Sequence, residues 1–371
     1  MDFDFTDDQE QLRDAVRKYV DKGYSFDRRR SIEAAGGFDR AAYTELAALG
    51  LTGLCIGDGY GGMGMGPVEC LVVHEELGRG LVLEPLEQAY ICGPVLENHA
   101  PELLKQQWLP RIAAGEALVV LAYQERKARY RLDVCETQAS KAGDGYTLTG
   151  TKNLVPTGDQ ADAYLVPAML GGQMALFLVE RAAQGVTARA YGCQDGSRAA
   201  DVLLHNAPAQ LLTPNGLVAL EQAVDIGITC ACAAGVGVMD KALAITVEYM
   251  NTRKQFGATL ATFQALRHRV ADMKMQLELG RSMAYFAALK MGESGPQRRR
   301  AIAQAKYQLG QSMRCVGQQA VQLHGGIGVT DEYIVSHYFK KLTQLEIAFG
   351  DSLHPLGEVS ARMQESAGVF A

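Results

Sequence analysis

The chain has 371 residues, of which 48% are hydrophobic and 21% are charged, a composition typical of a globular protein with two or three domains. Its 36 Lys and Arg against 42 Asp and Glu give a formal charge of −6, which disfavours nucleic acid and anionic membranes as partners. The longest uncharged apolar stretch, Ile226–Met239, has 14 residues, whereas a membrane-spanning helix needs about 20.

The amino-terminal segment, to about Gly115, has the spacing of helices. Met1–Phe5 is acidic and lacks the basic and apolar regions of a secretory signal, so we expect a cytoplasmic protein. Thr6 and Gln9 have the spacing of a capping box, in which each side chain accepts from the other residue's backbone N–H. The pattern then predicts helices at Arg40–Leu49, Pro67–Gly78, Pro85–His99 and Pro101–Ala114.

A glycine-rich stretch lies between two of these helices. Gly57-x-Gly59-x-x-Gly62 matches the dinucleotide-binding expression in its letters. A Rossmann site, however, requires a strand before the glycines and a helix that opens within them. Because the flanking segments are predicted to be helical, we interpret the stretch as a turn between helices.

The rest of the chain divides into a strand-rich part and a helical part. Short apolar runs bounded by turn residues predict a small antiparallel sheet or barrel between about Leu118 and Ala209. From about Gly216 onward, three apolar stripes at helical spacing predict long helices in an antiparallel bundle. We therefore expect three domains, at residues 1–117, 118–210 and 211–371.

The candidate metal ligands are scattered. The seven His include no pair at four-residue spacing, and the one close Cys pair, Cys230 and Cys232, is too tight for the usual zinc spacing. We expect no metal site and interpret these two thiols as structural members of a buried helix. Arg298–Arg300 follow Gly295-Pro296, and we interpret them as a solvated helix end.

Two segments combine residue types that bind phosphates. Arg253-Lys254-Gln255-Phe256-Gly257 ends a long helix and places a cation, an aromatic ring and a glycine break together, followed by Phe263-Gln264. Gln322–Gly328 ends another helix in three glycines that bare backbone N–H groups. From these residues alone, a phosphate-binding site and a pair of ordinary helix ends remain equally open.

Taken in order along the chain, these segments resemble the acyl-CoA dehydrogenase family. The family ends a bundle helix in Arg-x-x-Phe-Gly, followed by Phe-Gln, and carries Gln-x-x-Gly-Gly-x-Gly further on. Its other features are similar to Gly59–Gly62, Glu75–Gly78, Leu109–Glu116, Gly145–Lys152 and Glu332-Tyr333. The resemblance covers the whole chain. It implies an α+β, mainly α fold with an N-terminal helical domain, a central antiparallel β-barrel or sheet and a C-terminal four-helix bundle.

The resemblance also implies a reaction, the α,β-desaturation of an acyl-CoA thioester, with FAD as cofactor and electron-transfer flavoprotein as electron acceptor. Because the α-proton beside a thioester is weakly acidic, such a site needs a carboxylate base near Cα. In the family, the two phosphate-binding segments reach across a dimer interface to the partner's FAD. The resemblance therefore implies cofactor contacts for Arg253, Phe256, Gln264, Gln322, Gly325 and Gly326.

The positions of the family's base hold residues that cannot accept a proton. The usual Glu lies 24 residues after the first Gly of the pair, which is Phe349 here, and an alternative position is Gly227. Carboxylates lie two or three residues away, at Asp225, Glu346 and Asp351. The family's flavin-ring segments, a Thr-Glu-Pro loop and a Trp-Ile-Thr strand, correspond here to Gln124–Lys127 and Leu154–Pro156.

This pattern predicts a non-catalytic subunit that completes the FAD site of a base-bearing acyl-CoA dehydrogenase subunit, in a heterotetramer. No catalytic residue is predicted in this chain. Two alternatives remain: a self-sufficient homomeric dehydrogenase with a relocated carboxylate, and a purely structural subunit that contacts no cofactor. The retained Arg253 and Gln322 disfavour the structural subunit, and Phe349 and Gly227 disfavour the self-sufficient enzyme.

Overall fold

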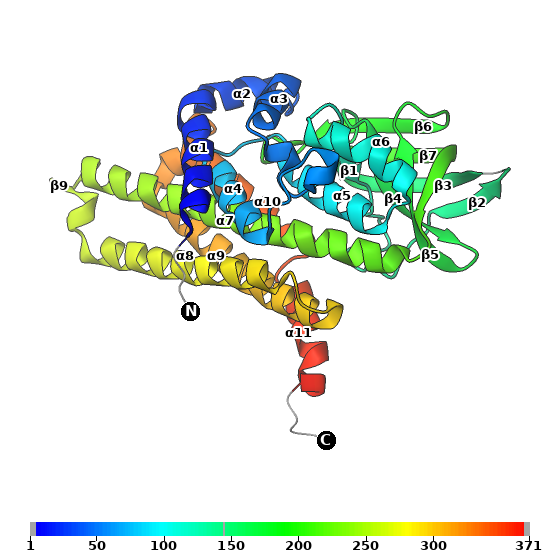
Figure 1. Cartoon of the computed structure of the whole chain (residues 1–371). Helices are drawn as coiled ribbons and strands as arrows, with labels where there is room; N and C mark the ends of the chain where they lie inside the picture. Colours follow the sequence, from blue (N-terminus) through cyan, green and yellow to red (C-terminus); the bar gives the residue numbers. More distant parts are fainter. Residues whose placement is uncertain (1–4, 144, 367–371) are drawn as a thin grey trace. The chain divides into compact units, whose positions relative to one another are not determined.

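The computed structural model describes residues 5–143 and 145–366 (Figure 1). It divides into two compact units. Unit 1 comprises Met1–Arg30, Pro67–Val82 and Ile228–Ala371, and unit 2 comprises Ser31–Gly66 and Leu83–Gly227. Helices α2 (Phe26–Ala34) and α7 (Gly216–Thr252) each contain residues of both units.

Unit 2 contains short helices and the sheet. The helices are α3 (Arg40–Ala48), η1 (Leu51–Gly53), η2 (Asp58–Tyr60), α5 (Leu86–His99) and α6 (Glu102–Ala113). The strands are β1 (Val119–Leu121), β2 (Gln138–Ala142), β3 (Gly145–Pro156), β4 (Ala163–Leu170), β5 (Gln173–Glu180), β6 (Val186–Gly192) and β7 (Arg198–Thr213).

The sheet closes into a barrel, as the resemblance implied. The pairings run β4–β2–β3–β7–β5 and return from β5 to β4, while β6 pairs with β7. Most pairs are antiparallel, and β1 and β2 lie parallel to β4. Alternate side chains such as Leu148, Phe177 and Val202 fill a core with no exposed surface. The β4–β5 hairpin turns through Gly171 and Gly172, both at positive φ, as a two-residue turn requires.

Unit 1 is helical. Its elements are α1 (Asp7–Gly23), α4 (Pro67–Arg79), most of α7, α8 (Gln264–Lys290), α9 (Gly295–His324), η4 (Gly325–Val329), α10 (Ile334–Ile347) and α11 (Leu353–Ser366). Helix α9 packs against α8, α10 and α11. Helix α7 is long and apolar enough to cross a membrane, but 78% of its most apolar window is buried inside the protein, as in the core helix of a globular protein.

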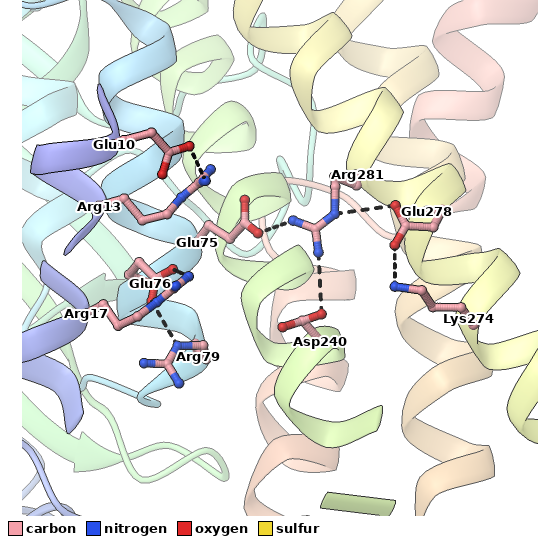
Figure 2. Close-up of polar contacts among 10 residues, drawn as sticks. All are labelled: Glu10, Arg13, Arg17, Glu75, Glu76, Arg79, Asp240, Lys274, Glu278 and Arg281. Carbon is pink, nitrogen blue, oxygen red and sulfur yellow. Dashed lines mark hydrogen bonds and ion pairs between the residues drawn. The ribbon is translucent and has the colours of Figure 1, made fainter. Parts of the chain in front are cut away.

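Helices α4 and α7 cross very closely, because glycine lies at the contact. A Cβ on Gly237 of α7 would overlap the Glu75 carbonyl, and one on Gly78 of α4 would overlap the carbonyl of Ala234. Beside this crossing, Arg281 of α8 pairs with Glu75 of α4, with Asp240 of α7 and with its own-helix neighbour Glu278 (Figure 2). Burial raises the pKa of Glu75, and Arg281 opposes that rise.

A second set of ion pairs joins α1 to α4. Glu76, which is almost fully buried, accepts from Arg17 of α1 and from Arg79 (Figure 2). Arg79 also pairs with Asp21. The Glu75–Gly78 segment therefore holds four helices of unit 1 together through paired charges at a tight crossing.

The structure confirms the main element predictions. The Thr6–Gln9 capping box is present, with both reciprocal hydrogen bonds. The four predicted amino-terminal helices form within one residue of their expected ends. The Gly57–Gly62 stretch is a turn around η2 with no preceding strand, so it lacks the context of a nucleotide site. Cys230 and Cys232 are buried and form no disulfide, as expected of structural members of a helix.

Candidate functional site

Helix α7 and helix α8 are joined by a short hairpin at one end of both helices (Figure 1). Strands β8 (Lys254–Gln255) and β9 (Ala258–Thr259) pair around a two-residue turn. The turn residues Phe256 and Gly257 have φ of 54° and 80°, and positive φ at both positions is what a type I′ turn requires. Glycine adopts this conformation freely, whereas for phenylalanine it costs roughly 1–2 kcal/mol.

The side chain of Phe256 makes few contacts within the fold that could offset the cost of its backbone conformation. It is 93% exposed, and its ring contacts the edge of Phe263 with centroids 6.3 Å apart. A large exposed apolar ring in a strained backbone is a signature of a functional position. The preceding Arg253 is also exposed, and its backbone N–H continues the helix by donating to the carbonyl of Tyr249.

The second predicted segment forms the end of α9. Gly325 has φ 66° and ψ −141°, a region that is essentially open to glycine alone. A Cβ on Gly325 or Gly326 would meet no atom within 4 Å, whereas one on Gly328 would lie 2.7 Å from the Val321 carbonyl oxygen. Gly328 is therefore required for packing, while Gly325 and Gly326 present bare backbone to open space.

Three aromatic rings bring the two segments together. Tyr249, in the last turn of α7, stacks on His324, the last residue of α9, with centroids 4.4 Å apart. Tyr333, which caps α10, lies 5.2 Å from His324 and 6.3 Å from Tyr249, measured between centroids. We call Arg253–Gly257 together with Gln322–Gly326 the hairpin–turn site.

All six residues for which the family resemblance implies cofactor contacts lie on the surface. They are Arg253, Phe256, Gln264, Gln322, Gly325 and Gly326. Within the described part of the chain, the side chains of Arg253, Gln264 and Gln322 make no hydrogen bond or ion pair. Residues 249–271 contain no Asp or Glu but four Arg and Lys. The hairpin and the first turns of α8 are therefore a basic segment in an acidic protein.

The chemistry of this surface is specific. An arginine beside an exposed glycine backbone binds phosphate oxygens, and an exposed phenyl ring stacks on a flat heteroaromatic group. The N–H of Gly325 itself donates to the carbonyls of Val321 and Gln322 at the end of α9. The arginine, the glycine turn and the phenyl ring all lie on an open surface. A ligand bound there would contact this chain with only part of its surface. The hairpin–turn site is therefore suited to one part of a ligand that contains a diphosphate and an aromatic ring.

The region of the missing base has a different character. Glu346 is buried, and its Oε1 accepts hydrogen bonds from Arg314 (2.8 Å) and from the backbone N–H and hydroxyl of Ser352 (3.1 and 2.7 Å). Asp351 accepts from the N–H groups of Leu353 and His354 and so caps helix α11. We call Glu346–Ser352 the closed turn, because its carboxylates are used within the fold.

A buried lysine donates hydrogen bonds to the backbone at the start of the closed turn. Lys306 of α9 is 1% exposed, and its Nζ donates to the carbonyls of Leu345 (2.6 Å) and Glu346 (3.0 Å). Burial lowers the pKa of Lys306 to about 8, although nearby acidic groups oppose this shift. Phe349, at the usual position of the base, lies in the turn with φ 59°. The other nearby carboxylate, Asp225, is buried in unit 2.

The segments that correspond to the family's flavin-ring loop and strand lie together in unit 2. Glu125 accepts from Lys152 (2.6 Å) and from the Thr137 hydroxyl (2.6 Å), and all three are buried. Burial would raise the pKa of Glu125, but Lys152 and the hydrogen bonds outweigh it and lower the pKa to about 2. The neighbouring Leu154 is 56% exposed at φ 52°, and its N–H donates to the Tyr191 hydroxyl.

Sequence reasoning found the two segments of the hairpin–turn site but missed what joins them. Tyr249 was not singled out, because it contacts His324 from 75 positions away in the sequence, and Tyr333 was identified only as part of the family resemblance and not as a contact of His324. An aromatic residue one turn before Arg253 was the available signal. The strain at Phe256 was also missed, since Asn-Gly or Gly-Gly, and not Phe-Gly, is the usual signature of such a turn. Within the described residues, no cluster of three His, Cys, Asp or Glu could hold a metal ion.

Comparisons with known proteins agree along the whole chain. The acyl-CoA dehydrogenase N-terminal domain matches residues 6–116, and the acyl-CoA dehydrogenase C-terminal domain matches residues 215–363. Acyl-CoA dehydrogenase FadE27 of Mycobacterium tuberculosis is 27% identical over 99% of this chain and 100% of its own length.

Solved structures of similar proteins share the fold. A chain of the ChsE4–ChsE5 complex from Mycobacterium tuberculosis superposes with a TM-score of 0.89, at 27% identity, over 99% of this chain and 100% of that one. A chain of a structure described as the electron transferring flavoprotein of Acidaminococcus fermentans gives a TM-score of 0.91, at 26% identity, over the whole of both chains.

Proposed function

This chain belongs to the acyl-CoA dehydrogenase family of FAD-dependent oxidoreductases, and we propose that within it the chain is a non-catalytic subunit that completes a partner's FAD site. The observation that carries the proposal is the outward display of Phe256 at a strained φ beside an exposed Arg253. An exposed ring held at the cost of backbone strain is explained by a ligand that lies outside this chain.

The donor set supports FAD as that ligand. Arg253 and the open surface at Gly325 and Gly326, where no side chain blocks a close approach, suit the two phosphates, and Phe256 suits the adenine ring. The exposed amides of Gln264 and Gln322 supply further polar contacts. FAD, when bound, supplies the acceptor for the hydride that leaves Cβ of the acyl chain. The part of this chain is to bind and orient the diphosphate end of the cofactor.

The absence of a usable base supports a non-catalytic role. Phe349 and Gly227 carry no proton acceptor, and the nearby Glu346 and Asp351 accept hydrogen bonds within the closed turn. The Glu346 carboxylate is buried and bound by Arg314 and Ser352, so it is used within the fold and is not displayed toward a substrate. The partner subunit therefore supplies the base that removes the α-proton.

We infer that the partner is a related, base-bearing acyl-CoA dehydrogenase chain in a cytoplasmic heterotetramer. The similar ChsE4–ChsE5 structure is a complex of two differently named chains, which supports this assembly. Electron-transfer flavoprotein is the proposed electron acceptor, and the similarity to a structure named for such a flavoprotein supports it. The acyl-CoA substrate would bind with its reactive carbons at the partner's base.

A dicarboxylic acyl-CoA is the substrate class that we propose. The segments Glu125–Tyr130, Gln194–Val202 and His337–Leu342 resemble the small subunit of pimeloyl-CoA dehydrogenase. In this chain they have structural roles: His337 contacts the buried Arg29, and Arg198 pairs with Asp159. The proposal therefore rests on the resemblance alone and not on recognition of the acyl chain by these residues, and ring-bearing acyl-CoAs are the alternative substrate class.

Replacement of Arg253 tests the proposed cofactor contact. In the complex assembled with the partner, Arg253→Ala should weaken FAD binding by about 1.5–3 kcal/mol, or roughly 10- to 100-fold, through loss of a charge-assisted phosphate contact. Flavin retention is measured by absorbance after dilution and gel filtration. Arg189→Ala is the matched control, because it removes the same charge from an exposed position on β6. Equal flavin retention in both variants would contradict the proposal.

The self-sufficient enzyme is tested with the chain purified alone. We expect a colourless protein that oxidises no acyl-CoA, since loss of a general base costs about 10²–10⁴-fold in rate. Co-expression with the base-bearing partner should give a yellow, active complex. Turnover by this chain alone, abolished by Glu346→Gln or Asp351→Asn, would establish a relocated base instead.

A further inference from the structure

His324 lies at the junction of the hairpin–turn site, and its hydrogen bonding leaves one ring nitrogen bare. The side chain is 3% exposed, and Nδ1 lies 2.8 Å from the carbonyl oxygen of Ala320, so Nδ1 carries the proton. No group in the described part of the chain lies within hydrogen-bond distance of Nε2, which is fully buried. The ring is therefore neutral, with its lone pair enclosed among apolar surfaces.

The surroundings of this ring connect the two halves of the site. One face stacks on Tyr249, four residues before Arg253, with an interplanar angle of 29°. Tyr333 packs beside both rings. Gly328 lies against the base of the His324 side chain, where an added Cβ would be 3.0 Å away. His324 directly precedes Gly325 in the chain, and its imidazole also contacts Tyr249 of α7, the helix that carries the hairpin.

We propose that His324 is a positioning residue whose neutral imidazole locks the glycine turn to the hairpin, so that Arg253 and Gly325 are presented together. This inference rests on the proposed function, because the two segments need a fixed position relative to each other only if one ligand contacts both. A protonated His324 would carry a second N–H without an acceptor. Protonation would then break the stack and release the turn from the hairpin.

The burial of His324 favours the neutral form of its imidazole. Burial lowers the pKa of His324, and the hydrogen bond to Ala320 opposes this shift only in part. The groups that face the ring from other elements are the phenols of Tyr249 and Tyr333. Burial and the charge of Glu248 both raise the pKa of Tyr333, so its phenol keeps its proton.

The direction of the pH effect follows from this shift. The folded-state pKa of His324 lies below the ordinary 6.5, so the unfolded chain binds the proton more readily. The stabilisation from the cluster is therefore complete above pH 6.5 and is lost as the pH falls below that value. The hairpin and the glycine turn should loosen together in mildly acidic solution.

Hydrogen–deuterium exchange on the purified full chain tests the lock without any flavin. Peptides that cover 253–260 and 322–330 are compared at about pH 7.5 and about pH 5, with His324→Phe at the same pH as the reference for the intrinsic rates. His324→Phe retains a stacking ring but cannot be protonated. Relative to it, we expect the natural chain to exchange both segments about tenfold faster at the lower pH and equally fast at the higher pH.

A second variant tests whether the His324 ring is needed to join the two segments. His324→Ala should speed exchange of both segments at both pH values, since it removes the ring that joins them. The proposal is overturned if His324→Phe shows the same acid response as the natural chain, or if only one of the two segments responds. Because flavin is absent from this experiment, its outcome is independent of the Arg253→Ala result, which tests the proposed function itself.

Discussion

The hairpin–turn site and the closed turn lie in the same unit, and both occupy positions where the family carries functional residues, yet they treat their polar groups in opposite ways. Arg253, Gln264 and Gln322 point outward and make no side-chain hydrogen bond within the described chain. Glu346 is buried and accepts three hydrogen bonds. The comparison suggests that the first region evolved for an external ligand, whereas the second became part of the internal structure.

The strongest test of this comparison removes the carboxylate of the closed turn. Glu346→Ala leaves the buried Ser352 N–H and hydroxyl without their acceptor, and we expect a loss of about 2–3 kcal/mol in the free energy of unfolding, measured by urea denaturation. Glu332→Ala, at an exposed position that makes no hydrogen bond within the described chain, should change stability by less than about 0.5 kcal/mol. A Glu346→Ala chain of natural stability that lost all turnover in the complex would reverse our interpretation of this residue.

Two adjacent glycines sharpen the other side of the comparison. Gly325→Ala forces an L-residue into a glycine-only conformation and should cost about 2 kcal/mol of stability. Gly326→Ala adds the same methyl group to open space at an ordinary backbone position, so it should leave stability nearly unchanged. If a diphosphate lies against this backbone, Gly326→Ala should nevertheless weaken flavin retention in the complex. Full retention by Gly326→Ala would show that the open space is not used.

Lys306, which binds the backbone of the closed turn, makes the stability of the chain depend on pH. The folded-state pKa of Lys306 is lowered to about 8 from 10.5, so between these values the unfolded chain binds more protons and stability rises with pH. Raising the pH from about 7 to about 9 should stabilise the natural chain by about 1 kcal/mol relative to Lys306→Met. The difference between the two unfolding curves is the measurement. A constant difference would mean that Lys306 keeps its charge throughout.

The element pattern was predictable from local signals, whereas the contrast between the two regions was not. The Thr6–Gln9 capping box and the helix-spaced apolar residues are local, and the structure confirms them. The orientation of Glu346 depends on Ser352 at the other end of the closed turn and on Arg314 of α9, while Lys306 of α9 binds the Glu346 carbonyl. No local pattern encodes these contacts, because hydrogen bonds between distant elements are decided by packing.

Sequence reasoning placed the hairpin–turn site by motif and family resemblance rather than by shape. Arg253 and Gln322 could be identified as phosphate-binding candidates from residue type and from the neighbouring glycines. The positive φ of Phe256 could not, because phenylalanine is among the residues least expected there. The roles of the six surface residues toward FAD remain proposals that the experiments above address.

The smallest expected effect comes from the hairpin itself, and it distinguishes strain retained for function from accidental strain. The β4–β5 hairpin makes the same kind of two-residue turn with Gly171-Gly172, at φ of 59° and 87°, whereas β8–β9 uses Phe256-Gly257. Asparagine tolerates positive φ far better than phenylalanine. Phe256→Asn should therefore stabilise the isolated chain by about 0.5 kcal/mol, after allowance for the lost contact with Phe263.

The same substitution should act in the opposite direction on the complex. Without an aromatic ring to stack on the cofactor, Phe256→Asn should retain flavin about two- to tenfold less well, since such a stacking contact contributes about 0.5–1.5 kcal/mol. Phe256→Tyr keeps both the ring and the strain, and it should match the natural chain in stability and in flavin retention. A Phe256→Asn complex that is both more stable and fully loaded with flavin would mean that the strain has no function. A gain in stability paired with a loss of flavin would show that the fold bears this strain because the ring is needed outside the chain.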